Sequence, residues 1–176
     1  MCIIGWLAWP TSHSVNGQAF EQMRTLTIRE SITIDAVPEV VWDFTQDYQQ
    51  RTRWDKSIKA AAVIRNQSPR VVLIRASGGL SATLTYKLDD RPKKTTLSLT
   101  DVRSRVISGG GGSWQYVQQG DHTLWTQTNT LILKRGLMMW AAGPFIGWIL
   151  KRNTRRAMQQ AKHIIESQRL VDAHQL

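Results

Sequence analysis

The chain has 176 residues, of which 41% are hydrophobic and 20% are charged, and this ordinary balance excludes a disordered or fibrous protein. Its length suits one domain with a hydrophobic core of its own. The single cysteine, Cys2, cannot form an intrachain disulfide, and the sequence has no cysteine and histidine spacing typical of a zinc site. The net charge of +10 favours an anionic partner, whether nucleic acid, ribosome, phospholipid surface or acidic ligand.

The first residues do not form a typical secretory signal. Met1–Pro10 is apolar but lacks a basic start and a small-residue cleavage pattern, which favours a cytoplasmic protein. Because the next residues are polar and aperiodic, we expect 1–22 to be a flexible extension, 23–168 to form the domain and 169–176 to be a tail. The longest apolar run, Gly136–Leu150, is shorter than the roughly 20 residues that span a bilayer, and Gly143-Pro144 interrupts it.

The domain is predicted to begin with a strand and two short helices. In Arg24–Asp35 apolar residues alternate as they do in a strand with one buried face, but the alternation slips near Glu30 and suggests a bulge. Pro38 suits the first turn of a helix, where its missing N–H has no intrahelical partner to lose. Asp47–Lys56 carries Trp54 and is predicted to be a second short helix or a turn.

Six further strands are predicted, because the apolar period changes to two and turn residues separate the segments. They are Ile58–Arg65, Val71–Ser77, Ala82–Leu88, Thr95–Arg103, Ser113–Gln118 and Thr123–Leu133. Their short connections favour antiparallel neighbours. Gly109–Gly112 lies where a strand would run, and we interpret this costly glycine run as a bulge or kink. A phosphate-binding loop is the alternative, but no Gly-Lys-Ser/Thr follows.

The last predicted helix, Phe145–Gln168, has one apolar face and one basic face. At about 1.5 Å per residue it would be about 36 Å long, enough to cross a whole sheet. We therefore expect its apolar face to pack on the strands. The apolar arc contains Leu150, Thr154, Ala157, Met158, Ala161, Ile164 and Ile165.

Several short motifs accompany these elements in order. They are Ile32-Thr33-Ile34-Asp35-Ala36, Pro38-Glu39-Val40-Val41-Trp42, Arg53-Trp54-Asp55, Gly112-Ser113-Trp114 and Gly120-Asp121-His122-Thr123. From residue 24 to 168 the chain thus resembles the helix-grip domains of the START / polyketide cyclase / pollen-allergen superfamily (SRPBCC). The resemblance implies an α+β fold in which a curved antiparallel sheet of about six or seven strands wraps around a long C-terminal helix, with two short helices after strand one. It also implies a cavity for lipids, sterols, polyketides, quinones or other apolar molecules, but no shared catalytic residues.

The strand pattern also predicts polar side chains on the inner face of the sheet. If Leu131 and Leu133 point inward, alternation places Trp125, Gln127 and Asn129 on the same face, and Asp101 shares a face with the strand leucines before it. Such polar groups either bond to one another and to buried water or orient the polar atoms of a ligand. The strand residues predicted to bind ligand are Leu84, Tyr86, Leu99, Asp101, Trp114, Trp125, Gln127 and Asn129.

The segment before the last helix is unusually apolar and carries flexible methionines beside aromatic residues. This composition suits a gate through which an apolar ligand passes, and core packing is the alternative. The predicted ligand contacts here are Met138, Met139, Trp140 and Phe145. By contrast, Trp42 and Trp54 are predicted to be core residues.

The basic face is the second clue to function, because no Asp or Glu occurs between His122 and Ile165. It is predicted to dock the domain on an anionic membrane, with a merely solvated face as the alternative. Binding to RNA or a ribosome is less favoured, because no stacking aromatics interleave with the arginines. The predicted anion-binding residues are Lys151, Arg152, Arg155, Arg156 and Lys162.

The sequence favours a binding protein over an enzyme. The four histidines have no evident carboxylate or nucleophile partner, and we expect no cofactor and no metal. The predicted function is therefore binding or transport of a hydrophobic small molecule, such as a lipid, quinone or polyketide-like compound. A cyclase or dehydratase with Asp101 as general base is the first alternative, and an RNA- or ribosome-associated protein is the second.

Overall fold

The computed structural model describes residues 25–173, with the backbone alone for 137–140 and 170–173, so the expected extension at 1–22 lies outside the described residues. A strand and two short helices come first: β1 (Thr25–Ile34), α1 (Pro38–Gln46) and α2 (Arg51–Trp54). Six strands and a long helix follow: β2 (Ile58–Arg65), β3 (Val71–Ala76), β4 (Ser81–Asp90), β5 (Lys94–Arg103), β6 (Ile107–Gln119), β7 (His122–Leu133) and α3 (Leu137–Ala173). A 3-10 turn, Ser77–Gly79, joins β3 to β4.

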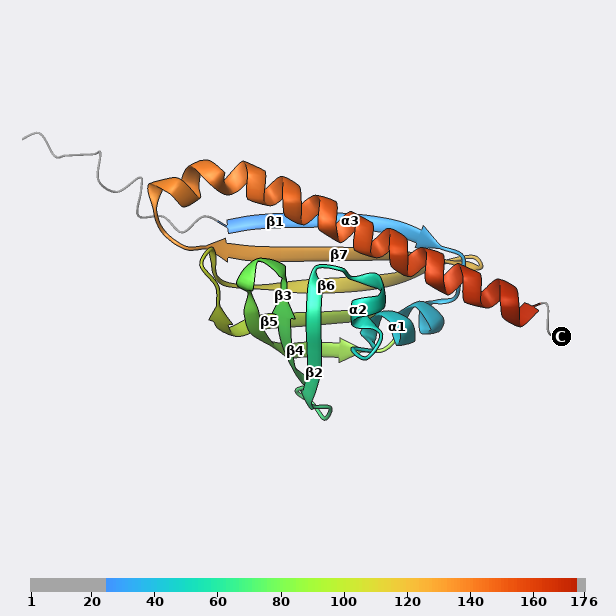
Figure 1. Cartoon of the computed structure of the whole chain (residues 1–176). Coiled ribbons are helices and arrows are strands. Elements are labelled where there is room, and N and C mark those ends of the chain that lie inside the picture. Colours follow the sequence, from blue (N-terminus) through green and yellow to red (C-terminus); the bar gives the residue numbers. More distant parts are fainter. Residues whose placement is uncertain (1–24, 174–176) are drawn as a thin grey trace, which may run out of the picture.

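The seven strands form one antiparallel sheet in the order β1-β7-β6-β5-β4-β3-β2. The sheet curves, and α3 runs diagonally across the strands, with α1 and α2 beside its C-terminal half (Figure 1). This arrangement is the predicted α+β helix-grip fold. It gives the sheet one face that is covered by α3 and one face that is open to solvent.

β1 differs from the prediction near Glu30. Its pairing with β7 is continuous from Thr25 to Ile34, so the expected bulge is wrong. The apolar alternation is interrupted in the sequence because Glu30 takes an inward position that an apolar residue would normally occupy. Glu30 is only 9% exposed there. Arg155 on α3 donates to its carboxylate, with 3.0 Å between Nε and Oε2. The buried charge is thus paired.

β6 runs unbroken through the four glycines and is longer than the predicted Ser113–Gln118. The irregularity that the glycines suggested lies at the beginning of the run, where the register with β7 shifts between Ile107 and Gly109. At Gly110, φ is +154° and a Cβ would collide with the carbonyl oxygen of Thr130. A Cβ at Gly111 would lie 2.6 Å from the carbonyl oxygen of Leu97. These two positions therefore require glycine for close contact with both neighbouring strands.

β5 contains a bulge that the sequence did not predict. Its register with β4 shifts between the pairs Thr83↔Thr100 and Ser81↔Arg103. Asp101 adopts a φ of 48° there and is exposed. The expectation that Asp101 shares the inner face of β5 is therefore wrong, because the extra residue turns its side chain outward.

α3 has 37 residues and begins well before the predicted Phe145, so Pro144 lies inside it. The expected interruption at Gly143-Pro144 is wrong, because the helix continues through it. A proline removes one backbone hydrogen bond and can kink a helix without ending it. The first turns of α3 curve away from the direction of the rest (Figure 1). Residues 169–173, expected in the tail, are helical. Among the described helices, none is long and apolar enough to cross a membrane.

Aromatic side chains fill the space under the C-terminal half of α3. The rings of Trp54, Trp114 and Trp125 pack edge to face, with centroids 5.6–6.2 Å apart. From α3, Met158 and Ala161 pack against this cluster. Trp54 is 1% exposed and Trp42, in the same cluster, is 5% exposed, which confirms both as core residues. This aromatic core therefore sits at one end of the interface between the sheet and α3, and a second buried cluster lies around Tyr48, Ile74 and Leu84.

Candidate functional site

A cavity of about 480 Å³ lies at the other end of that interface, between the sheet and the N-terminal half of α3. Its walls come from both sides of the interface and are mainly aliphatic. This volume falls within the roughly 300–1,000 Å³ that is usual for small-molecule sites. Representative lining residues are Ile28, Leu84, Leu97 and Leu99 on the strands and Ile146 and Ile149 on α3.

Five of the predicted ligand-binding residues line this cavity. They are Leu84, Leu99, Trp114, Gln127 and Asn129. Strand register explains why they meet, because Gln127 on β7 lies opposite Trp114 on β6. Asn129 lies opposite Gly112 on the same strand. The predicted inward face of β7 is therefore present in the structure.

Four of the other predicted residues do not line it. Trp125 is fully buried in the aromatic core, and Tyr86 is buried in a hydrogen-bond network next to the cavity. Asp101 is exposed next to the β5 bulge and does not line the cavity. Phe145 is 63% exposed on α3. The side chains of residues 138–140, which include the predicted gate residues Met138, Met139 and Trp140, lie outside the described residues.

The glycines of β6 lie at the edge of the cavity. Gly112 lies between Leu97 of β5 and Asn129 of β7, and Gly110 lies between Leu99 and Leu131 in the same way. Within this run Gly111 lines the cavity. A Cβ at Gly110 would collide with a backbone oxygen of a neighbouring strand, and one at Gly111 would lie 2.6 Å from another, so these glycines allow close contact between strands. The leucines on either side supply the wall of the cavity.

Arg51 is a lining residue that sequence reasoning missed. Its guanidinium lies 4.2 Å from the ring centroid of Trp54 and 4.7 Å from that of Trp114. Its Nη2 donates to Asp55 Oδ2 at 2.8 Å, and Asp55 Oδ1 accepts from the Ser57 hydroxyl at 2.5 Å. The i,i+4 spacing of Arg51 and Asp55 on a predicted helix was a signal that could have found this pair.

The Arg51 side chain is only 12% exposed, and its Nε and Nη1 are buried without a hydrogen-bond partner. The same is true of Nε2 of Gln127, whose residue is 4% exposed. Buried polar groups are nearly always bonded, so these unpaired donors stand out. Both residues line the cavity.

A network of tyrosine hydroxyls closes one side of the cavity. Tyr48 lines it and lies 2.6 Å, hydroxyl to hydroxyl, from Tyr86, which donates to Gln46 Oε1 at 3.0 Å. The guanidinium of Arg70 lies 3.9 Å from the Tyr86 ring centroid. Burial raises the pKa of Tyr48 and raises that of Tyr86 well above its ordinary value. Both hydroxyls therefore stay protonated and hold the wall in place.

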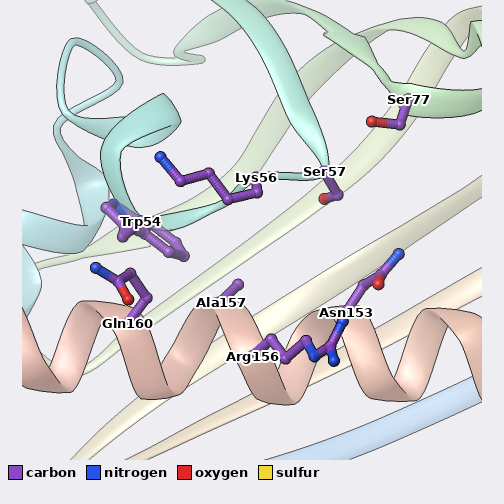
Figure 2. A pocket seen from close by; sticks show the side chains of 8 residues that line it. All are labelled: Trp54, Lys56, Ser57, Ser77, Asn153, Arg156, Ala157 and Gln160. Atoms are coloured by element: carbon purple, nitrogen blue, oxygen red, sulfur yellow. The ribbon is translucent and has the colours of Figure 1, made fainter.

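A smaller polar pocket of about 360 Å³ adjoins the cavity. Figure 2 shows Trp54, Lys56 and Ser57 on one side of it, facing Arg156 and Gln160 on α3. Four residues line both spaces: Ser57, Ser77, Asn153 and Ala157. The polar pocket and the apolar cavity thus share part of one wall.

The predicted anion-binding face of α3 is largely paired within the chain. Lys151 and Arg155 both contact Glu30, with Lys151 Nζ 3.6 Å from Oε1. Lys162 contacts Glu166 at 3.2 Å and donates to the carbonyl oxygen of Thr33 at 2.7 Å. Their positive charge is therefore partly offset.

Of the remaining two basic residues, Arg152 lies beside exposed aromatic rings. Phe145 and Trp148 stack with centroids 6.0 Å apart, and Trp148 is 54% exposed. The guanidinium of Arg152 lies 5.2 Å from the Trp148 ring centroid. Arg156 is exposed one turn further along α3. These four residues, spaced three or four apart, form what we call the aromatic–basic stripe.

The family model described as polyketide cyclase / dehydrase and lipid transport matches residues 25–166. The fold already defines a helix-grip domain of the START-like superfamily. The match covers most of the chain, so the chain belongs to the polyketide cyclase / dehydrase and lipid transport family. No curated protein matches it at a significant level.

Solved structures share this fold at low sequence identity. The Zhui aromatase/cyclase from Streptomyces sp. R1128 is 12% identical with a TM-score of 0.71, covering 81% of this chain and 94% of that one. A START superfamily protein from Mycobacterium smegmatis is 11% identical with a TM-score of 0.69, covering 81% and 98%. Ara h 8.0201 is 10% identical with a TM-score of 0.63, covering 82% and 99%. At such identities the likeness concerns the fold alone.

Proposed function

We propose that this protein binds a hydrophobic small molecule, such as a lipid, quinone or polyketide-like compound, in the cavity between the sheet and α3. The observation that carries the proposal is the cavity of about 480 Å³ with its mainly aliphatic lining. An apolar ligand would remove that surface from water, at roughly 25 cal/mol per Å² of apolar area. Membership of a family described by both cyclases and lipid transport agrees with this role.

Binding is better supported than acid–base catalysis. The ionisable lining residues in the described part of the chain are Tyr48, Arg51 and Asp55. Asp55 is fixed by Arg51 and Ser57, and the raised pKa of Tyr48 makes it a poor base. Asp101, the predicted general base, is outside the cavity. A general base needs a proton acceptor that is free to reach the substrate, so we favour a carrier over a cyclase.

The cavity can be tested with N-phenyl-1-naphthylamine, an uncharged apolar dye whose fluorescence rises in apolar surroundings. We expect saturable binding at one site per chain. In Leu99→Trp the larger side chain fills the cavity, and we expect at least a tenfold loss of affinity. Val117→Trp is the matched control, because Val117 is 51% exposed on a strand and does not line the cavity. Equal binding by both variants would contradict the proposal.

We further propose that the aromatic–basic stripe docks this end of α3 on an anionic membrane surface. The exposed Phe145–Trp148 stack supports this, because aromatic rings favour the membrane interface and one basic residue near an anionic surface contributes about 1 kcal/mol. Ile146 and Ile149, on the neighbouring face of the same turns, line the cavity. Docking there would bring the membrane next to the cavity.

Vesicle sedimentation tests the stripe. Wild-type protein is expected to sediment with phosphatidylcholine vesicles that contain about 30% phosphatidylglycerol, and binding should fall at least fivefold in Phe145→Ser/Trp148→Ser. Gln159→Ser, also on the exposed surface of α3, is the control. Docking through this stripe would be refuted if binding were the same in the double variant as in the wild type and the same with and without the anionic lipid. RNA that competes with the vesicles for wild-type protein but not for the double variant would favour a nucleic-acid partner instead.

A further inference from the structure

The polar pocket beside the cavity gathers positive charge. Lys56, just after α2, lies on one side of it, and Arg156 of α3 lies on the other (Figure 2). Within the described part of the chain, no Asp or Glu lines this pocket. Its α3 residues lie three or four positions apart, on one face of the helix. They are Asn153, Arg156, Ala157 and Gln160. The lining therefore favours an anion.

Both cations can reach a molecule in the pocket. Lys56 and Arg156 are exposed, and within residues 25–173 neither forms an ion pair. Lys56 Nζ donates to the carbonyl oxygen of Thr52 at 3.4 Å, which leaves two of its protons for another acceptor. Arg155, by contrast, is bonded to Glu30. The two lining cations thus differ from the paired basic residues of α3.

The carboxylate next to Lys56 in the sequence does not neutralise them. Asp55 is 6% exposed, and its Oδ2 accepts from Arg51 at 2.8 Å while its Oδ1 accepts from the Ser57 hydroxyl at 2.5 Å. A carboxylate bonded to a guanidinium in this way has its charge balanced there. The pocket therefore keeps an excess of positive charge.

Small side chains form the boundary between the polar pocket and the apolar cavity. Ser57, Ser77 and Ala157 line both spaces, together with the half-buried Asn153. The two serines and the alanine extend no more than one atom beyond Cβ, so the boundary that they form is low. Aliphatic walls on one side of it and two cations on the other match a molecule with an apolar chain and an anionic end.

We propose that the ligand of this protein is an anionic amphiphile, whose apolar chain lies in the cavity and whose carboxylate or phosphate lies between Lys56 and Arg156. This inference rests on the proposed function, because it specifies the ligand of the same cavity. Ammonium and guanidinium groups both donate charge-assisted hydrogen bonds to carboxylate and phosphate oxygens. Because the two cations are exposed, the anion keeps part of its hydration and avoids the cost of full burial.

Decanoate and 1-decanol test the anionic end, as competitors of N-phenyl-1-naphthylamine in vesicle-free buffer in which decanoate is ionised. Their chains have the same length, but only decanoate is charged. An apolar cavity alone would prefer the alcohol, which is the more hydrophobic of the two. We expect wild-type protein to bind decanoate about fivefold more tightly instead.

Removing the two cations should reverse that preference. In Lys56→Gln/Arg156→Gln we expect the alcohol to bind more tightly and the dye to bind as before, because neither residue lines the cavity. Lys59→Gln/Arg103→Gln is the matched control. It removes the same charge from exposed strand residues that line neither space, so it should keep the wild-type preference. All four residues are exposed, so both variants should melt at the wild-type temperature.

An added carboxylate gives an independent readout. In Gln160→Glu the new charge lies in the pocket, four residues from Arg156, and should lower the affinity for decanoate at least threefold without changing that for 1-decanol. Gln168→Glu adds the same charge at an exposed position of α3 outside the pocket. This control should leave both affinities unchanged.

Free anions distinguish the end of an amphiphile from a site for a free ion. Inorganic phosphate or acetate, at about ten times the decanoate concentration, should not lower the affinity for decanoate, because neither has a chain that holds the anion in place. If phosphate abolishes the preference for decanoate, the pocket is a site for the free ion and the proposal is wrong.

The remaining outcomes separate this proposal from the proposed function. If the dye binds but wild-type protein prefers 1-decanol, the anionic amphiphile is wrong and the cavity still binds an apolar ligand. The same conclusion follows if Lys56→Gln/Arg156→Gln keeps the wild-type preference, or if the control variant loses it. If the dye, decanoate and 1-decanol all fail to bind, the proposed function itself is overturned.

Discussion

One face of α3 lies over the sheet, but the packing beneath the two halves of this helix differs. In the packed half, Met158, Ala161 and Ile165 lie against the buried aromatic rings. In the cavity half, Ile146 and Ile149 face a space of about 480 Å³. Both β6 and β7 run below the two halves, so part of the difference lies in the side chains that these two strands carry.

The comparison indicates that the size of the side chains along β6 separates the packed half from the cavity half. β6 carries Trp114 and Tyr116 in the aromatic core, whereas Gly111 lines the cavity. Tightly packed aromatic rings dominate the energy of a small core. That energy allows the other half to stay open, although a cavity costs stability.

The largest expected effect comes from the packed half. Trp125→Ala should lower the free energy of unfolding by about 3–5 kcal/mol, because the indole is fully buried among other aromatic rings and its removal leaves a cavity. Urea denaturation would measure this. Trp148→Ala, which truncates an indole that is 54% exposed, is the matched control and should change stability by less than about 0.5 kcal/mol.

If both substitutions lower the free energy of unfolding by the same amount, the aromatic cluster is not the main source of stability. The contrast between the two halves would then lose its physical basis.

A smaller effect is expected in the cavity half. Leu99→Ala should lower the free energy of unfolding by only about 1 kcal/mol. Leu99 is partly buried and borders the cavity, so its side chain has fewer contacts to lose than a core leucine has. The same urea denaturation applies. A loss of 3 kcal/mol or more would mean that this side chain is as tightly packed as the core, which a pre-formed cavity does not permit.

Much of the fold could be predicted from the sequence, because the period of the apolar residues is a local signal. The alternation in β7 placed Trp125, Gln127 and Asn129 on one face, and the structure agrees. The errors came from long-range effects. Glu30 looked like a break in β1 because its partner, Arg155, is distant in the sequence.

The site was harder to predict than the fold. A bulge in β5 turned Asp101 outward, and only its pairing with β4 reveals that bulge. Arg51 was missed because a charged residue in a short helix usually faces water, and its place over Trp114 depends on how α2 sits against β6. Alternation along a strand gives the face of a residue but does not say whether the space in front of it is filled.

The most direct test of the account is a crystal structure of the protein with N-phenyl-1-naphthylamine. The account predicts dye density between Leu99 of β5 and Ile149 of α3, in contact with Trp114, with the aromatic packing around Trp125 unchanged. Dye found only on the exposed Phe145–Trp148 stack, with the space between the sheet and α3 closed by the protein's own side chains, would contradict it.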